Sequence, residues 1–150
     1  MDDREIVERQ LGRAPRAFRR VAVRCPFGRP AVTEQAPLDE NGRPFPTQYY
    51  VTCSYLVAAI SRVEAAGGVE RWTRAAEDDP ALARSLEDAH AQQRALRPEL
   101  ASGIGGSTRS GSLKCLHAHA AFALAQPGYE LGERILAELP SLWPDSCCTP

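Results

Sequence analysis

The sequence has almost no lysine. Lys114 is its only one, whereas arginine supplies the other seventeen side chains of the basic total of 18. An ammonium group is a compact point charge and a guanidinium is a planar fork, so the two are not interchangeable. A single lysine among arginines therefore indicates that this position has a specific requirement for an amine. The segment Lys114–His119 also holds one of the five cysteines and two of the three histidines. This concentration of amine, thiol and imidazole groups marks a candidate site.

The chain also lacks long apolar runs. No stretch approaches the roughly 20 apolar residues that cross a bilayer, and the acidic segment 1–5 has no apolar core of a signal peptide. The formal net charge is only -1, so bulk electrostatics favours neither nucleic acid nor a membrane surface as a partner. We therefore expect a cytoplasmic protein that binds neither.

Cysteine is too sparse for a disulfide scaffold. Five cysteines form an odd set without the dense spacing of small secreted domains. In a reducing compartment, spaced cysteines are ligands, nucleophiles or core residues. A chain of 150 residues suits one domain over residues 1–150 with a single core. We expect that core to span residues 1–140, followed by a tail, 141–150, that contains proline, Cys147 and Cys148.

The pattern of apolar residues predicts both strands and helices. Alternation and β-branched or aromatic residues predict strands near residues 18–24, 31–36 and 47–53. Helical spacing, with capping residues, proline and glycine at the ends, predicts the helices; these cover residues 2–11, 54–66, 69–76, 79–96, 113–125 and 131–139. We place Ser54 as the cap of the second helix. The predicted fold class is α+β, with a small antiparallel β-sheet of about three strands from the N-terminal third packed against a mainly helical C-terminal two-thirds.

Three cysteines lie at the edges of predicted elements. Cys25 is in a turn between two strands, Cys53 is at a strand-to-helix junction, and Cys115 is near the start of a helix. Thiolates and imidazoles from such positions can complete a four-ligand zinc site. His117 is the fourth ligand if Cys115 precedes the helix. If the helix already includes Cys115, His119 at i+4 shares its face and substitutes for His117.

A glycine-rich and serine-rich loop precedes this segment. Backbone amides at Gly105, Gly106 and Ser107, together with Lys114, predict an anion-binding loop. By composition alone a mobile surface loop is the favoured interpretation, and it is the position beside Cys115 that supports the anion site. No Gly-Lys-Ser/Thr follows the glycines, so the loop does not match a nucleotide-binding P-loop.

Four motifs occur in order along the chain, at 10–16, 24–30, 44–53 and 114–117. Together they resemble the DUF501 family, bacterial proteins of unknown function that are common in actinobacteria, and the likeness runs from about residue 5 to residue 140. The family often has proline where this chain has Ser54, and it admits histidine in place of Cys53. Such an exchange implies a metal ligand at this position rather than a packing residue.

Three functions fit these residues. The first is a cytoplasmic metal-binding protein whose ligands are Cys25, Cys53, Cys115 and His117, with zinc as first choice and a [4Fe–4S] cluster as second. The second is a cysteine-dependent enzyme with Cys115 as nucleophile, and with Lys114 and the glycine loop holding a small anionic substrate. The third is a non-catalytic interaction module in which the cysteines are buried structural residues.

Overall fold

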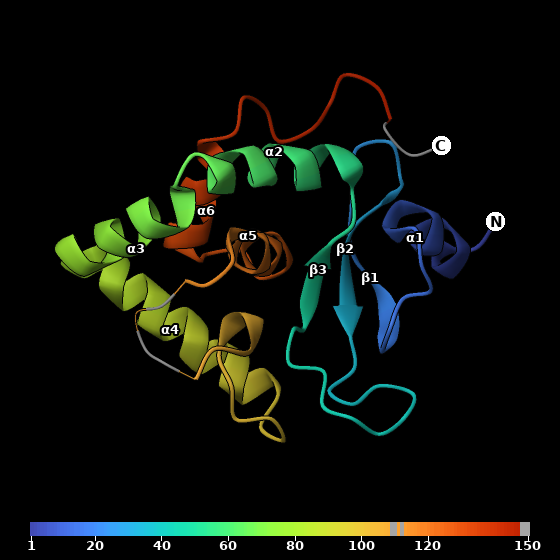
Figure 1. Cartoon of the computed structure of the whole chain (residues 1–150), viewed down its shortest axis with the longest axis horizontal. Coiled ribbons are helices and arrows are strands. Elements are labelled where there is room, and N and C mark those ends of the chain that lie inside the picture. The colour runs from blue at the N-terminus through green and yellow to red at the C-terminus, as the bar shows by residue number, and fades with distance from the viewer. Residues whose placement is uncertain (109–110, 112, 148–150) are drawn as a thin grey trace.

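The computed structural model describes residues 1–108, 111 and 113–147 of the chain. The expected α+β fold is confirmed, with the strands in the N-terminal third and most helices after them (Figure 1). In chain order the elements are α1 (Asp3–Leu11), β1 (Phe18–Arg24), β2 (Pro30–Gln35), β3 (Tyr49–Val51), α2 (Ser54–Ala65), α3 (Gly68–Asp78), α4 (Pro80–Leu96), the short 3-10 helix η1 (Ile104–Gly106), α5 (Leu116–Ala125) and α6 (Glu130–Ala137).

The three strands form one antiparallel sheet in the order β1-β2-β3. Every residue of the central strand β2 is buried, whereas β1 is an irregular, half-buried edge strand with register shifts. Val32 of β2 pairs with Val23 of β1 on one side and with Val51 of β3 on the other. β3 is shorter at both ends than the segment 47–53 predicted from the sequence: it begins at Tyr49 and ends at Val51, two residues before the N-cap residue of α2.

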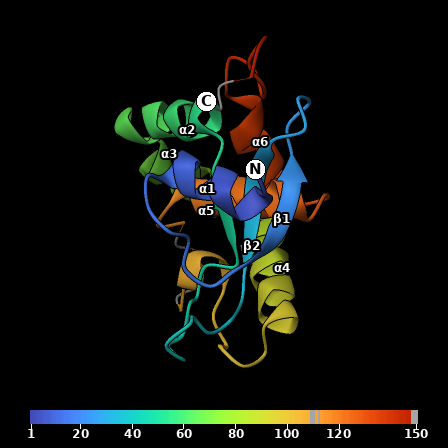
Figure 2. The same cartoon turned by 90° about the vertical axis from the view of Figure 1, so that its right-hand side faces the viewer.

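Helices cover both faces of the sheet. α1 packs on one face through the buried side chains of Ile6 and Val7, and α5 packs on the other (Figures 1 and 2). α5 lies between the sheet and the group formed by α3, α4 and α6, and most of its residues are buried. A helix that is apolar around its whole circumference is a core helix. The start of α5 is therefore enclosed by other elements, and this enclosure positions the site described below.

α5 begins three residues later than its apolar pattern predicted. Lys114 has a φ of 55°, in the left-handed region that cannot continue a right-handed helix. The amide of Cys115 donates a hydrogen bond to the carbonyl of Leu113, only two residues back, with a donor–acceptor distance of 2.5 Å. This tight turn lies before the helix, and Cys115 is therefore the N-cap residue of α5.

The cap of α2 also differs from the expectation. Cys53 occupies the N-cap position in an extended conformation, and Ser54 is the first helical residue. The Cys53 side chain makes no capping hydrogen bond and is 3% exposed, within the main hydrophobic core. A buried thiol at this position packs as a small apolar group.

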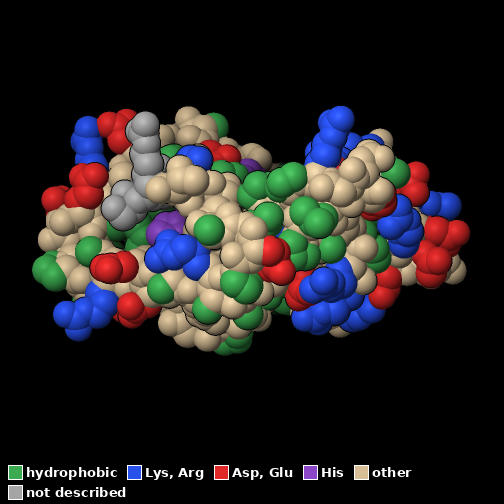
Figure 3. Space-filling view, turned by 90° about the horizontal axis from the view of Figure 1, so that it is seen from below, with side chains coloured by type: hydrophobic (Ala, Val, Ile, Leu, Met, Phe, Trp, Pro, Cys, Tyr) green, Lys and Arg blue, Asp and Glu red, His purple; other side chains and the backbone are tan. Residues whose placement is uncertain are grey.

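The molecular surface carries charges of both signs. Basic and acidic side chains both occur on the face shown in Figure 3, with hydrophobic side chains gathered between the two ends. Within the described part of the chain, no helix has both the length and the apolar character needed to cross a membrane.

A buried arginine connects α4 to the loop before β3. The Arg97 side chain donates hydrogen bonds to the carbonyl of Phe45, at 2.7 Å, and to the carbonyl of Gln35. Arg97 is only 2% exposed, and Gln35 and Phe45 are also buried. Replacing Arg97 by methionine is expected to lower the free energy of unfolding by about 2–4 kcal/mol, because two buried acceptors lose their donor. Urea titration measures this change. Arg94→Met, at an exposed position of the same helix, is the control and should change stability by less than about 0.5 kcal/mol.

Candidate functional site

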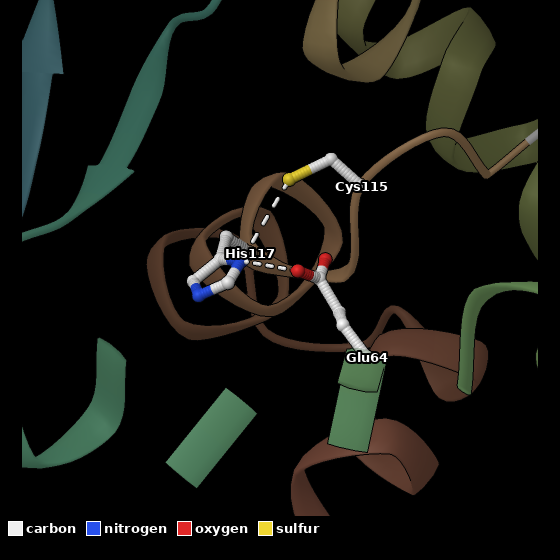
Figure 4. A group of neighbouring side chains, drawn as sticks. All are labelled: Glu64, Cys115 and His117. Atoms are coloured by element: carbon white, nitrogen blue, oxygen red, sulfur yellow. Dashed lines mark hydrogen bonds and ion pairs between the residues drawn. The ribbon is translucent and has the colours of Figure 1, made fainter. Parts of the chain in front are cut away.

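Two helices bring three ionisable side chains together. Glu64 projects from the last turn of α2, whereas Cys115 and His117 belong to the N-terminus of α5 (Figure 4). In Figure 4 the Cys115 and Glu64 side chains both point toward the imidazole ring of His117. Each of the three side chains is partly buried. We call these three residues the Glu64/Cys115/His117 group.

Both neighbours approach the same ring nitrogen of His117. Its Nδ1 lies 3.2 Å from Glu64 Oε1 and 3.8 Å from Cys115 Sγ. One oxygen, nitrogen or sulfur atom from each residue lies within 4.8 Å of the other two. The second Glu64 oxygen, Oε2, accepts a hydrogen bond of 2.7 Å from the amide of Leu116. The N-terminus of α5 thus fixes the carboxylate that faces the ring.

The other ring nitrogen faces groups that orient the imidazole. Nε2 of His117 lies 3.2 Å from the carbonyl oxygen of Val57 and 3.2 Å from Oγ of Ser61, both on α2. A carbonyl can only accept, so Nε2 carries a proton and donates it to Val57. In the neutral ring, Nδ1 then holds a lone pair that points at Cys115 and Glu64.

The surroundings of His117 favour a positive charge at this point. Its pKa is raised to about 9, chiefly by the interaction with the Cys115 side chain, with further contributions from the Val57 carbonyl and the charge of Glu64. Partial burial opposes this shift. In the metal-free protein a proton therefore occupies the space between the imidazole, the thiol and the carboxylate.

His119 occupies a different environment from His117. Its side chain is fully buried, with Nε2 3.0 Å from the carbonyl oxygen of Leu113 and Nδ1 2.8 Å from the hydroxyl of Tyr129. Burial lowers its pKa to about 3. Because Cys115 precedes the first turn of α5, it is His117 that lies beside the thiol, and His119 faces the core.

The structure brings together two of the four metal ligands predicted from the sequence. Among the described residues, the metal-ligand atoms that cluster belong to Cys115, His117 and Glu64, and neither Cys25 nor Cys53 joins them. Cys25 is half-buried in the β1–β2 turn and packs against the core, whereas Cys53 lies within the core. Cys147 is exposed, and Cys148 lies outside the described residues.

Glu64 was not predicted from the sequence. It lies 51 positions before Cys115 in the chain, near the end of a helix that also holds the charged residue Arg62. A glutamate in such a setting is typical of a solvated helix face. Only the packing of α2 across the start of α5 places it at the site, and no local sequence signal predicts that contact.

Two of the three amides of the predicted anion-binding loop donate hydrogen bonds within the loop itself. The Gly106 amide donates to the carbonyl of Gly103, at 3.1 Å, and the Ser107 amide donates to the carbonyl of Ile104, at 3.3 Å. Gly105 and Gly106 adopt positive φ angles that close this turn on itself. The Lys114 side chain is exposed. Residues 109, 110 and 112 of the predicted loop lie outside the described residues.

A cavity of about 560 Å³ adjoins the group. Residues of α2, β3 and the start of α5 form its walls, and Cys115 and His117 both line it. Its volume lies within the range of small-molecule pockets, about 300–1,000 Å³. We call this space the α2–β3 cavity.

One comparison with known proteins gives a match. The family profile "Protein of unknown function (DUF501)" matches residues 21–103. This region includes Cys25, Cys53 and Glu64 and ends before Cys115. No curated protein and no solved structure matches the chain. Because the profile covers more than half of the 150 residues, the chain belongs to the DUF501 family, and the motifs at 24–30 and 44–53 lie within the matched region.

Proposed function

We propose that this protein binds one divalent metal ion, with zinc preferred, through Cys115, His117 and Glu64. The observation that carries the proposal is the convergence of a thiol, an imidazole nitrogen and a carboxylate oxygen from two helices on one point. Thiolate, imidazole and carboxylate are the three side-chain types that bind zinc in proteins. The proposal keeps Cys115 and His117 from the set predicted by the sequence and adds Glu64.

The spacing of these atoms fits a tetrahedral ion. Zinc bonds of about 2.0–2.3 Å place neighbouring ligand atoms roughly 3.3–3.7 Å apart. The distances of 3.2 Å from Glu64 Oε1 and 3.8 Å from Cys115 Sγ to His117 Nδ1 differ little from that range. Small side-chain rotations are sufficient to accommodate the ion.

The surrounding hydrogen bonds also support a metal site. A ligating histidine usually donates its other ring N–H to a carbonyl or carboxylate, which fixes the orientation of the ring. Val57 supplies that carbonyl to His117 Nε2, and the Leu116 amide holds the second oxygen of Glu64. Both orienting groups belong to the backbone of the two helices that carry the ligands.

Three protein ligands favour a zinc site with an open position. Structural zinc sites use four protein ligands, whereas catalytic sites use three and keep one position for water or substrate. Such an ion acts as a Lewis acid toward what binds there. Cys115 and His117 line the α2–β3 cavity, which supplies the space for that ligand. A [4Fe–4S] cluster needs more thiolates than the one in this group, and we therefore favour zinc.

Cobalt substitution tests the ligand set directly. Co²⁺ replaces zinc in thiolate sites and gives a thiolate-to-metal charge-transfer band together with visible bands typical of tetrahedral coordination. We expect one Co²⁺ per chain, with the charge-transfer band lost in Cys115→Ser and kept in Cys25→Ser and Cys53→Ala. Loss of the band in either of the last two variants, with folding intact by circular dichroism, would show that the four-residue set is the site instead. A colourless wild-type protein would contradict both sets.

A cysteine nucleophile is the second candidate function. The distance of 3.8 Å between Cys115 Sγ and His117 Nδ1 lets the imidazole act as a base toward the thiol. Glu64 approaches the same ring nitrogen, however, and competes for the proton that such a base would carry. In cysteine and serine hydrolases the orienting group lies instead on the opposite ring nitrogen. This competition makes nucleophilic catalysis the weaker of the two proposals.

Alkylation by iodoacetamide distinguishes the two candidates. Cys147 is exposed and serves as an internal reference in the same digest. For a metal site, we expect zinc to slow the modification of Cys115 by at least about tenfold and to leave Cys147 unchanged, because the ligating sulfur is occupied. The nucleophile hypothesis predicts the opposite result: Cys115 is alkylated faster than Cys147, and zinc does not change the rate of its alkylation.

A further inference from the structure

We infer that the α2–β3 cavity binds a small, mainly apolar organic molecule that has a polar group at each of two places, one at Thr52 and one at the open metal position. The metal-facing half of this inference rests on the proposed function. The cavity and its apolar character do not, and they are testable on the metal-free protein.

The walls of the cavity define the body of the ligand. Most of the wall is apolar, and no lysine or arginine occurs among the described residues that line it. The apolar side chains that the argument uses are Leu11, Tyr49, Val51, Val57, Ala58 and Ala118. An anionic substrate, as expected from the sequence, would find no basic side chain on these walls besides the imidazole of His117. Burial of apolar surface is the contribution that this cavity offers to binding.

One polar atom in the wall lacks a partner. Thr52 is 1% exposed and lines the cavity, and its Oγ1 makes no hydrogen bond within the described part of the chain. Buried hydroxyl groups are hydrogen-bonded in the great majority of proteins, and leaving one unpaired costs free energy. A carbonyl, hydroxyl or amide group on a bound molecule would satisfy it. Thr52 therefore fixes one end of the ligand.

The second polar point lies on a different element. Thr52 directly follows β3, whereas Cys115 and His117 lie at the start of α5. The lining between them comes from α2, β3 and α1, and it is mostly apolar. A molecule that reaches both points must place an apolar body between two polar groups. This arrangement specifies orientation through two polar contacts and affinity through the apolar body, as small-molecule sites generally do.

A neutral fluorophore tests the cavity independently of any metal. N-phenyl-1-naphthylamine increases its emission on entering an apolar site, and we expect saturable binding of one molecule to metal-free protein. Ala58 lines the cavity from an exposed position of α2, so Ala58→Trp should fill the space without disturbing folding. We expect this variant to lose at least about tenfold in affinity, since the wall area available to the probe falls. Ala95→Trp, at an exposed position of α4 away from the cavity, is the matched control and should bind normally.

A chain-length series then tests the link to the metal. Straight-chain alkyl hydroxamic acids carry a zinc-binding head, and their affinity for zinc-loaded protein should rise about fourfold for each added methylene until the cavity is filled. The same series should bind Ala58→Trp without this dependence. Thr52→Val removes the unpaired hydroxyl oxygen of Thr52 from the wall. Binding of all-apolar tails should therefore strengthen, and binding of tails that end in a hydroxyl group should weaken because they lose their hydrogen-bond partner.

The outcomes separate the two proposals. Fluorophore binding that Ala58→Trp abolishes, with no effect of zinc on hydroxamates, would keep the cavity inference and reject the metal site. Suppose instead that the protein binds cobalt, that all hydroxamic acids bind with the same affinity whatever their chain length, and that the fluorophore does not bind. This result would keep the metal site and overturn the inference. A fluorophore that binds wild type and Ala58→Trp equally well would also overturn it.

Discussion

Zinc at a hundredfold excess over its dissociation constant is expected to stabilise the folded protein by about 2.7 kcal/mol. The reason is that the three ligands meet only in the folded chain, because Glu64 comes from α2 while Cys115 and His117 come from α5. An unfolded chain offers the ion no comparable group. For a chain of this size the stabilisation corresponds to a rise of roughly 5–10 °C in the unfolding midpoint, which differential scanning calorimetry can measure.

Removing one ligand should abolish this stabilisation. Cys115→Ser, His117→Ala and Glu64→Gln are each expected to weaken zinc binding by at least about 100-fold, since loss of an outer partner alone costs 10–100-fold. Glu64→Gln is the most informative of the three, because a glutamine oxygen can still accept the hydrogen bond of the Leu116 amide. Glu70→Gln, at an exposed position of α3, is its matched control. Equal stabilisation of wild type and all three ligand variants by zinc would show that the ion binds elsewhere.

The sequence predicted the fold well where capping residues mark the ends of elements. The start of α4 is an example: Asp79 precedes Pro80, and the Asp79 side chain accepts a hydrogen bond of 2.9 Å from the Ala81 amide. Both signals are local, because the capping side chain and the proline act within one turn. The boundaries of β1, at Phe18–Arg24, were predicted from its alternating residues for the same reason.

The site was harder to predict, because its geometry depends on long-range contacts and on one unusual backbone angle. A left-handed φ at Lys114 has no signature in the sequence, since lysine rarely adopts this conformation. That angle nevertheless decides that Cys115 precedes α5 and that His117 lies beside it. At Cys53 the sequence pattern suggested a functional residue where the structure has a buried one. Its place at a strand-to-helix junction is typical of functional residues, yet the core encloses its side chain.

Acidification should destabilise the metal-free protein between pH 6.5 and pH 3, and His119 is the main cause among the histidines. Its pKa falls from an ordinary value of about 6.5 to about 3 in the folded state, because the fully buried ring cannot be hydrated when charged. Above pH 6.5 the His119 ring is neutral in both states, and its contribution to stability does not change with pH. Below it, the unfolded chain binds a proton that the folded chain excludes, so stability falls by about 1.4 kcal/mol per pH unit.

Two other histidines modify this slope in opposite ways. The pKa of His90 is also lowered by burial, and its Nδ1 already accepts a hydrogen bond of 3.0 Å from the Ile104 amide, so His90 adds to the loss in acid. The pKa of His117 is raised, so its contribution is constant below pH 6.5 and is lost only as the pH rises toward 9. Between pH 5 and pH 6.5 the carboxylates remain ionised, and the histidines therefore dominate the slope.

His119→Gln isolates the contribution of His119. Glutamine can still donate to the carbonyl of Leu113 but does not titrate, so the variant is less stable at pH 7 and yet loses about 2 kcal/mol less than wild type between pH 6.5 and pH 5. Urea unfolding at a series of pH values measures the difference in slope, which does not depend on the packing cost of the substitution. His117→Gln should keep the wild-type slope over the same interval. Parallel curves for wild type and His119→Gln would mean that the folded protein admits the proton, and that the ring between Leu113 and Tyr129 is less enclosed than its contacts indicate.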